Sequence, residues 1–83
     1  MAMSQVHKAD FSELKKGMRG KITAVPVPSP ESTRLEEMGL TIGTEFYVVK
    51  VAPFGDPVEI ELRGYRLCLR KRETNGFEVE LLS

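Results

Sequence analysis

The feature that most constrains the fold is a pair of alternating segments separated by the dipeptide Arg63-Gly64. Apolar residues occupy every second position over residues 58–62 and again over residues 65–69. A two-residue hairpin loop pairs Leu62 with Tyr65 and places the apolar side chains of both strands on one face, whereas a shift of one residue would mix the faces. The pattern therefore predicts a β-hairpin with six inward apolar side chains: Val58, Ile60, Leu62, Tyr65, Leu67 and Leu69.

The rest of the chain predicts three more strands and one short helix. Ser29 is suited to the N-cap of this helix, Pro30 to its first position, and Gly39 to the left-handed residue after its end at about Met38. Gly17 and Gly20 are expected to bracket a turn before the first strand. The three strands are expected over residues 21–25, 44–52 and 77–81.

Five short amphipathic strands in 83 residues predict a mainly β fold with one or two short helices inserted. Each strand has one apolar face to cover, and at this length a small, strongly bent five-stranded barrel does so more economically than a two-sheet sandwich. We expect one domain over residues 10–83, preceded by a flexible segment over residues 1–9. Of the six aromatic residues, we assign Phe11, Phe46, Tyr65 and Phe77 to the core.

The charge balance argues against nucleic acid and membrane as partners. The chain has 12 Lys and Arg against 12 Asp and Glu, whereas nucleic-acid binders and polybasic anchors depend on a surplus of cations. A basic stretch lies within residues 63–72, but Glu59 and Glu61 face part of it across the hairpin, so we interpret it as a balanced, solvated surface. No apolar run approaches the ~18 residues that span a bilayer, and the chain does not begin with a secretory sequence. We therefore predict a cytoplasmic protein without direct membrane insertion.

The sequence does not suggest an enzyme, a cofactor or a metal site. Cys68 is the only cysteine and His7 the only histidine, so one chain cannot build a disulfide or a thiolate–imidazole metal site. A cysteine nucleophile needs a base, and His7 lies in the segment that we expect to be flexible. Carboxylate pairs such as Glu36 and Glu37 are ordinarily solvated.

Four stretches, taken in order, resemble the ferrous iron transport protein A (FeoA) family. They are residues 11–22, residues 34–48, the loop Ala52-Pro-Phe-Gly-Asp-Pro57, and residues 60–70. The segment after Arg70 departs from the family pattern, and Asn75-Gly76 predicts a tighter turn there.

The resemblance implies an SH3-like barrel and a non-enzymatic role in bacterial ferrous iron uptake. Members of the family are associated with the membrane GTPase-transporter FeoB, so the resemblance implies docking on the cytoplasmic part of FeoB and a peripheral position at the inner membrane. The alternatives are a regulatory SH3-like domain of iron-dependent-repressor type acting with another chain, a direct ferrous-iron carrier, and a small RNA-binding barrel. We expect a monomer or a weak homo-oligomer.

Two segments are candidates for binding the partner. The outer side of the predicted helix carries Arg34, Glu36 and Glu37. The loop after the second strand is either a rigid corner or a partner-facing loop with Phe54 as an exposed aromatic anchor, and both can hold. Its candidate residues are Pro53, Phe54, Gly55, Asp56 and Pro57.

Overall fold

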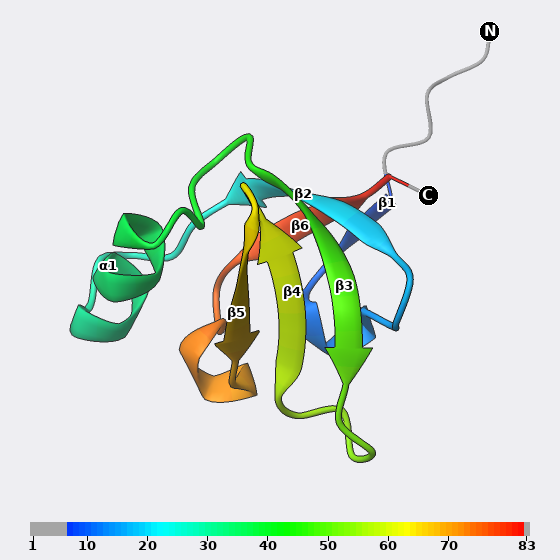
Figure 1. Cartoon of the computed structure of the whole chain (residues 1–83). Coiled ribbons are helices and arrows are strands. Elements are labelled where there is room, and N and C mark those ends of the chain that lie inside the picture. The colour runs from blue at the N-terminus through cyan, green and yellow to red at the C-terminus, as the bar shows by residue number, and fades with distance from the viewer. Residues whose placement is uncertain (1–6, 83) are drawn as a thin grey trace, which may run out of the picture.

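The computed structural model describes residues 7–82, which form six strands, one α-helix and two short 3-10 helices (Figure 1). In chain order these are β1 (His7–Ala9), η1 (Phe11–Glu13), β2 (Arg19–Ala24), α1 (Pro30–Glu37), β3 (Glu45–Val51), β4 (Val58–Leu62), β5 (Tyr65–Leu69), η2 (Lys71–Glu73) and β6 (Glu78–Leu81). Of the helices described, none is long and apolar enough to cross a membrane.

The strands pair antiparallel in one sheet with the order β1–β6–β2–β3–β4–β5. Figure 1 shows the sheet bent on itself, with β3, β4 and β5 in front of β1, β6 and β2. The core lies between these two halves, and it contains fully buried side chains from both, such as Ile22, Val48, Ile60 and Val79. The predicted mainly β fold is confirmed, with six strands in place of five.

The additional strand lies in the segment that was predicted to be flexible. His7–Ala9 form β1, whose residues pair with Leu81, Glu80 and Val79 of β6, and Ala9 is buried. A three-residue strand is too short to show the alternation by which strands are recognised in a sequence. The sheet therefore begins at His7, within the segment 1–9. Residues 1–6 of that segment lie outside the described residues, so their predicted flexibility stays a prediction.

The β4–β5 hairpin has the predicted register, with Leu62 opposite Tyr65 and Glu61 opposite Arg66. Arg63 and Gly64 have φ of 51° and 86°, as a type I′ turn requires. Five of the six expected core side chains are buried, but the assignment of Tyr65 to the core is wrong, because 42% of this residue is exposed. Its hydroxyl donates a hydrogen bond to the carbonyl oxygen of Met38 at the end of α1.

Both ends of α1 are as predicted. The hydroxyl oxygen of Ser29 accepts a hydrogen bond from the N–H of Ser32 (3.1 Å), and the hydroxyl oxygen of Ser32 accepts one from the N–H of Ser29 (2.9 Å). Gly39 follows the helix with φ of 113°, and the N–H of Leu40 donates to the carbonyl oxygen of Leu35 (3.0 Å). This reciprocal N-cap and glycine C-cap satisfy backbone groups that would otherwise lack partners.

Gly20 lies within β2 and does not form part of a turn, contrary to prediction. A Cβ atom at this position would lie 2.7 Å from Cζ of Phe46, so the absence of a side chain lets the Phe46 ring lie directly on the backbone of β2. The same ring stacks on Phe11 with a centroid separation of 5.7 Å, and Phe77 meets Phe11 edge-on. Gly20 thereby makes room for the aromatic part of the core.

We expect the Gly20→Ala substitution to lower the free energy of unfolding by about 1–3 kcal/mol, because the added methyl group displaces the Phe46 ring. Urea unfolding followed by circular dichroism measures this change. Lys21→Ala, at the next position of β2, serves as the control and should change the free energy by less than about 0.5 kcal/mol. Equal midpoints for Gly20→Ala and the unsubstituted protein would contradict the packing role of Gly20.

Candidate functional site

The loop between β3 and β4, residues 52–57, is a closed corner. The N–H of Ala52 donates to the carbonyl oxygen of Pro57 (3.1 Å), and the N–H of Gly55 donates to the carbonyl oxygen of Ala52 (2.8 Å). Gly55 has φ of 85°, in the left-handed region that favours glycine. These bonds give the loop a defined shape, in agreement with the rigid corner expected from its sequence.

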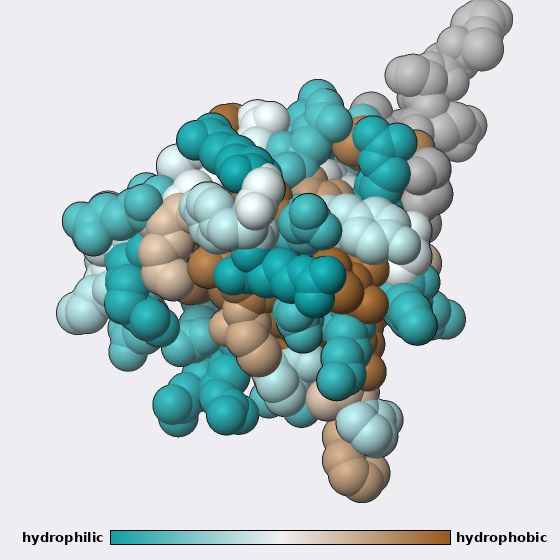
Figure 2. Space-filling model, viewed as in Figure 1, coloured by the Kyte–Doolittle hydropathy of each residue, from teal (hydrophilic) through white to brown (hydrophobic). Residues whose placement is uncertain are grey.

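Phe54 lies at the tip of this loop with 95% of its surface exposed. Figure 2 shows the loop projecting from the lower end of the molecule as an apolar tip. The phenylalanines Phe11, Phe46 and Phe77 are all buried, so Phe54 differs from every other phenylalanine of the chain. The predicted exposure of this aromatic side chain is confirmed.

A shallow hollow of about 290 Å³ lies beside the loop on the outer face of the sheet. Its surface is mainly apolar, and Cys68 of β5 contributes an exposed thiol. The alternation of Leu67 and Leu69 with Cys68 implies that Cys68 lies on the outer strand face, but its position beside the loop depends on how β3, β4 and β5 pair. We call this the apolar hollow; it is lined by Lys50, Ala52, Pro53, Pro57, Glu59 and Cys68.

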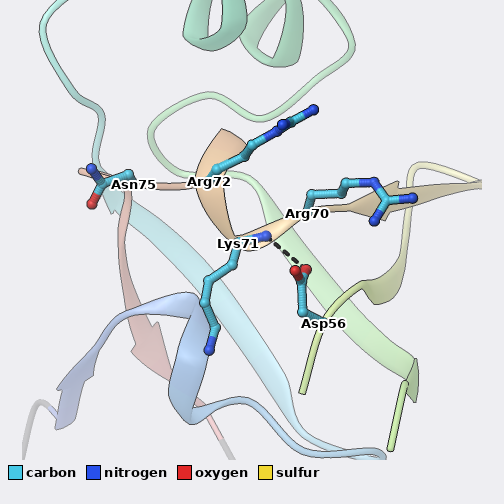
Figure 3. Close-up of a pocket in the computed structure, with 5 residues that line it drawn as sticks. All are labelled: Asp56, Arg70, Lys71, Arg72 and Asn75. Carbon is cyan, nitrogen blue, oxygen red and sulfur yellow. Dashed lines mark hydrogen bonds between the residues drawn. The ribbon is translucent and has the colours of Figure 1, made fainter. Parts of the chain in front are cut away.

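Asp56 lines a different hollow from Pro53 and Pro57. Its Oδ1 accepts a hydrogen bond from the backbone N–H of Lys71 at 2.8 Å, which ties the loop to η2 (Figure 3). This open hollow, of about 720 Å³, is called the basic hollow; it is lined by Asp56, Arg70, Lys71, Arg72 and Asn75. The predicted loop residues are therefore divided between two surfaces, with Pro53 and Pro57 at the apolar hollow and Asp56 at the basic one.

The three candidate residues of α1, Arg34, Glu36 and Glu37, differ in their contacts and in their exposure to solvent. Arg34 donates to Oε2 of Glu73 at 2.8 Å, while Oε1 of Glu73 accepts the N–H of Arg70 at 3.1 Å. Arg34 thus joins α1 to η2 through an ion pair within the chain. Glu36 is partly buried and Glu37 is exposed. Figure 1 shows α1 and the β3–β4 loop at separate ends of the molecule, so the two predicted segments do not form one site.

The basic stretch also separates into two parts. On the hairpin, Arg66 forms an ion pair with Glu59 (3.5 Å), and Arg63 donates to the hydroxyl oxygen of Thr44 (3.4 Å). Within the described residues, no carboxylate oxygen lies within 4.0 Å of a side-chain nitrogen of Arg70, Lys71 or Arg72. The interpretation as a balanced, solvated surface therefore holds for the hairpin, whereas residues 70–72 are exposed to solvent as expected but form no ion pair within the described residues.

Lys71 has an acidic residue in its neighbourhood, Asp10, with which it lines a further hollow. The hydroxyl and the backbone N–H of Ser12 donate to Asp10, and these bonds lower the pKa of its carboxyl, with a smaller contribution from the charge of Lys71.

Among the described residues, no group of three or more His, Cys, Asp and Glu side chains is arranged to hold a metal ion.

Comparison with known proteins identifies relatives along most of the chain. The FeoA domain model matches residues 11–81. A fusion of Fe(2+) transport protein A with the Fe(2+) transporter FeoB, from Porphyromonas gingivalis strain W83, is 36% identical over 73 residues; the match spans 88% of this chain and 9% of the relative. The structure is similar to a FeoA-like protein from Clostridium acetobutylicum, with a TM-score of 0.82, 33% identity, and coverage of 95% and 92% of the two chains.

The zinc complex of FeoA from Stenotrophomonas maltophilia, described as a prokaryotic SH3 domain protein, has a TM-score of 0.73 and 25% identity over 86% of this chain and 88% of that one. The SH3-like fold expected from the sequence is thereby confirmed.

The hydrogen bond from the N–H of Lys71 to Asp56 should slow the exchange of the Lys71 amide hydrogen with solvent. Asp56→Ala removes the acceptor, so the amide hydrogen of Lys71 should exchange about five-fold faster, corresponding to a loss of about 1 kcal/mol. Asp56→Asn retains an oxygen acceptor and should have a smaller effect. Hydrogen exchange followed by NMR measures both, with the buried amide of Ile60 as an internal reference. Unchanged exchange at Lys71 in Asp56→Ala would show that the bond does not hold the loop to η2.

Proposed function

The chain belongs to the FeoA family, and on this premise we propose that it is a non-enzymatic accessory protein of bacterial ferrous iron uptake. In this proposal it docks on the cytoplasmic part of the FeoB transporter and assists or regulates transport. Its position would then be peripheral at the inner membrane, through the partner.

The observation that carries this proposal is the fusion of a related FeoA segment with FeoB in one polypeptide. A covalent link keeps two parts together at a high effective concentration, and such a link is of use when the parts act on each other. Where the same two parts are separate chains, contact between their surfaces must replace the link. The present chain would supply one of these surfaces.

Phe54 and the apolar hollow form the best candidate for that surface, and we call them together the docking face. Phe54 exposes nearly its whole ring to water, and the adjoining hollow is also mainly apolar. Exposed apolar surface of this kind is a feature of protein interfaces, and the residues that contribute most to binding are often large side chains at the centre of such a surface. The hydrogen bonds within the loop support this role, since a preformed loop loses little conformational freedom on binding.

The outer side of α1 remains a second candidate contact. Glu37 is exposed there, whereas the ion pair of Arg34 with Glu73 commits that guanidinium to a contact within the chain. The docking face is favoured over α1 because it combines an exposed aromatic ring with an adjoining apolar hollow. The repressor-type alternative stays a prediction.

Binding to FeoB of the same organism tests the proposal. The labelled chain is titrated with the full transporter in detergent and, separately, with its cytoplasmic domain. We expect Phe54→Ala to weaken binding at least ten-fold, because truncation of a central aromatic anchor costs about 2 kcal/mol. Val27→Ala is the matched control, since Val27 is also a strongly exposed apolar residue (84%) but lies between β2 and α1. It should bind as the unsubstituted chain does.

The single thiol provides an independent measurement of the face. Cys68 lines the apolar hollow and is exposed, so bound FeoB should slow its alkylation by iodoacetamide, as followed by mass spectrometry of this chain. Absence of binding to either form of FeoB at ~100 μM would overturn direct docking. Binding without protection of Cys68 and without an effect of Phe54→Ala would place the contact elsewhere, and the double substitution Glu36→Gln with Glu37→Gln would then test α1.

A further inference from the structure

The basic hollow concentrates positive charge in a chain whose formal net charge is zero. Arg70, Lys71 and Arg72 contribute three cations to its lining, against one carboxylate from Asp56. We propose that this hollow binds the phosphate group of an anionic ligand, and that Arg70 and Arg72 hold the phosphate oxygens. The proposal concerns a surface other than the docking face and does not depend on FeoB.

The two arginines are arranged differently from the lysine between them. In Figure 3 the side chains of Arg70 and Arg72 extend toward the same side of the view, whereas that of Lys71 extends away from them. Lys71 also lines the neighbouring hollow, together with Asp10. Arginine is the side chain best suited to phosphate, because its planar guanidinium donates two parallel hydrogen bonds to a pair of oxygens.

The nearby carboxylates are already engaged by other groups. One oxygen of Glu73 accepts from Arg34 and the other from the N–H of Arg70, and Oδ1 of Asp56 accepts from the N–H of Lys71. The bonds from Arg70 and Lys71 are donated by their backbone N–H groups, so they fix the segment that carries the arginines without engaging either guanidinium group. Within the described residues neither arginine has an ion-pair partner.

Asp56 sets a limit on affinity, because its negative charge lies in the same lining as the two arginines. A phosphate ligand gains attraction from the guanidinium groups and loses part of it through repulsion by this carboxylate. Removal of the carboxylate charge should therefore strengthen binding. A general attraction of anions would respond alike to the loss of any exposed carboxylate, so an effect larger at Asp56 than at carboxylates outside the hollow distinguishes a site that includes Asp56.

A titration of the isotope-labelled full chain with inorganic pyrophosphate, followed by NMR, tests the proposal. We expect saturable shifts at residues 70–75 and at Asp56. The double substitution Arg70→Gln with Arg72→Gln should weaken binding at least ten-fold, while the control, Lys15→Gln with Lys16→Gln, should change it by less than two-fold. Lys15 and Lys16 are exposed cations outside the hollow, so both double variants change the net charge equally. Asp56→Asn should strengthen binding about two- to five-fold.

The absence of saturable shifts up to ~10 mM pyrophosphate would overturn the proposal. Equal weakening by the two double substitutions would overturn it as well, because net charge alone would then account for the binding. Since the titration uses this chain without FeoB, its outcome and that of the docking experiment are independent of each other.

Two sources can supply such a phosphate: a soluble compound or the headgroup of an anionic lipid. Sedimentation with vesicles of phosphatidylcholine, with and without phosphatidylglycerol, distinguishes them. Binding that requires phosphatidylglycerol and is lost in the Arg70→Gln, Arg72→Gln variant would assign the site to a lipid headgroup. Binding of pyrophosphate without binding to either vesicle would assign it to a soluble ligand, and both results support a phosphate site.

Discussion

The pairing of Leu62 with Tyr65 across the turn at Arg63-Gly64 is the constraint on which the rest of the structure depends. Because side chains alternate along a strand, this one pairing determines which residues of β4 and β5 enter the core and which reach the surface. It places Glu59 and Cys68 opposite each other on the outer face, where both line the apolar hollow. It also sets where β5 ends. Arg70 follows directly after this strand, and residues 70–72 line the basic hollow.

The sequence was sufficient for features whose determinants lie within a few residues. The turn at Arg63-Gly64 and the serine cap and glycine end of α1 were predicted because their side chains or backbone angles act locally. Features that depend on distant partners were missed. β1 forms because β6 provides a strand to pair with. Position 20 requires glycine because a side chain there would collide with the Phe46 ring. Tyr65 lies outside the core because its hydroxyl donates to the carbonyl oxygen of Met38.

The same distinction explains the candidate sites. Exposure of Phe54 followed from a proline- and glycine-containing loop that is longer than a hairpin requires, which is a local property. The bonds that join Asp56 to Lys71 and Arg34 to Glu73 connect residues 15 and 39 positions apart, so no spacing in the sequence indicates them. Glu59 and Glu61, which face part of the basic stretch across the hairpin, suggested a balanced surface. In the structure Glu59 pairs with Arg66 and Glu73 pairs with Arg34, and the guanidinium groups of Arg70 and Arg72 have no ion-pair partner within the described residues.

The β3–β4 loop links the two surfaces physically. Asp56 is anchored on η2, while Pro53 and Pro57 line the apolar hollow and Phe54 projects from the tip. Only Gly55 separates Phe54 from Asp56, and its N–H is bonded to Ala52. The bond from Lys71 to Asp56 therefore holds the backbone of the loop two residues from Phe54. In the docking on FeoB that we propose, a loop whose backbone is already held would lose less conformational entropy on binding, so the Lys71–Asp56 bond at the edge of the basic hollow would favour binding at the docking face.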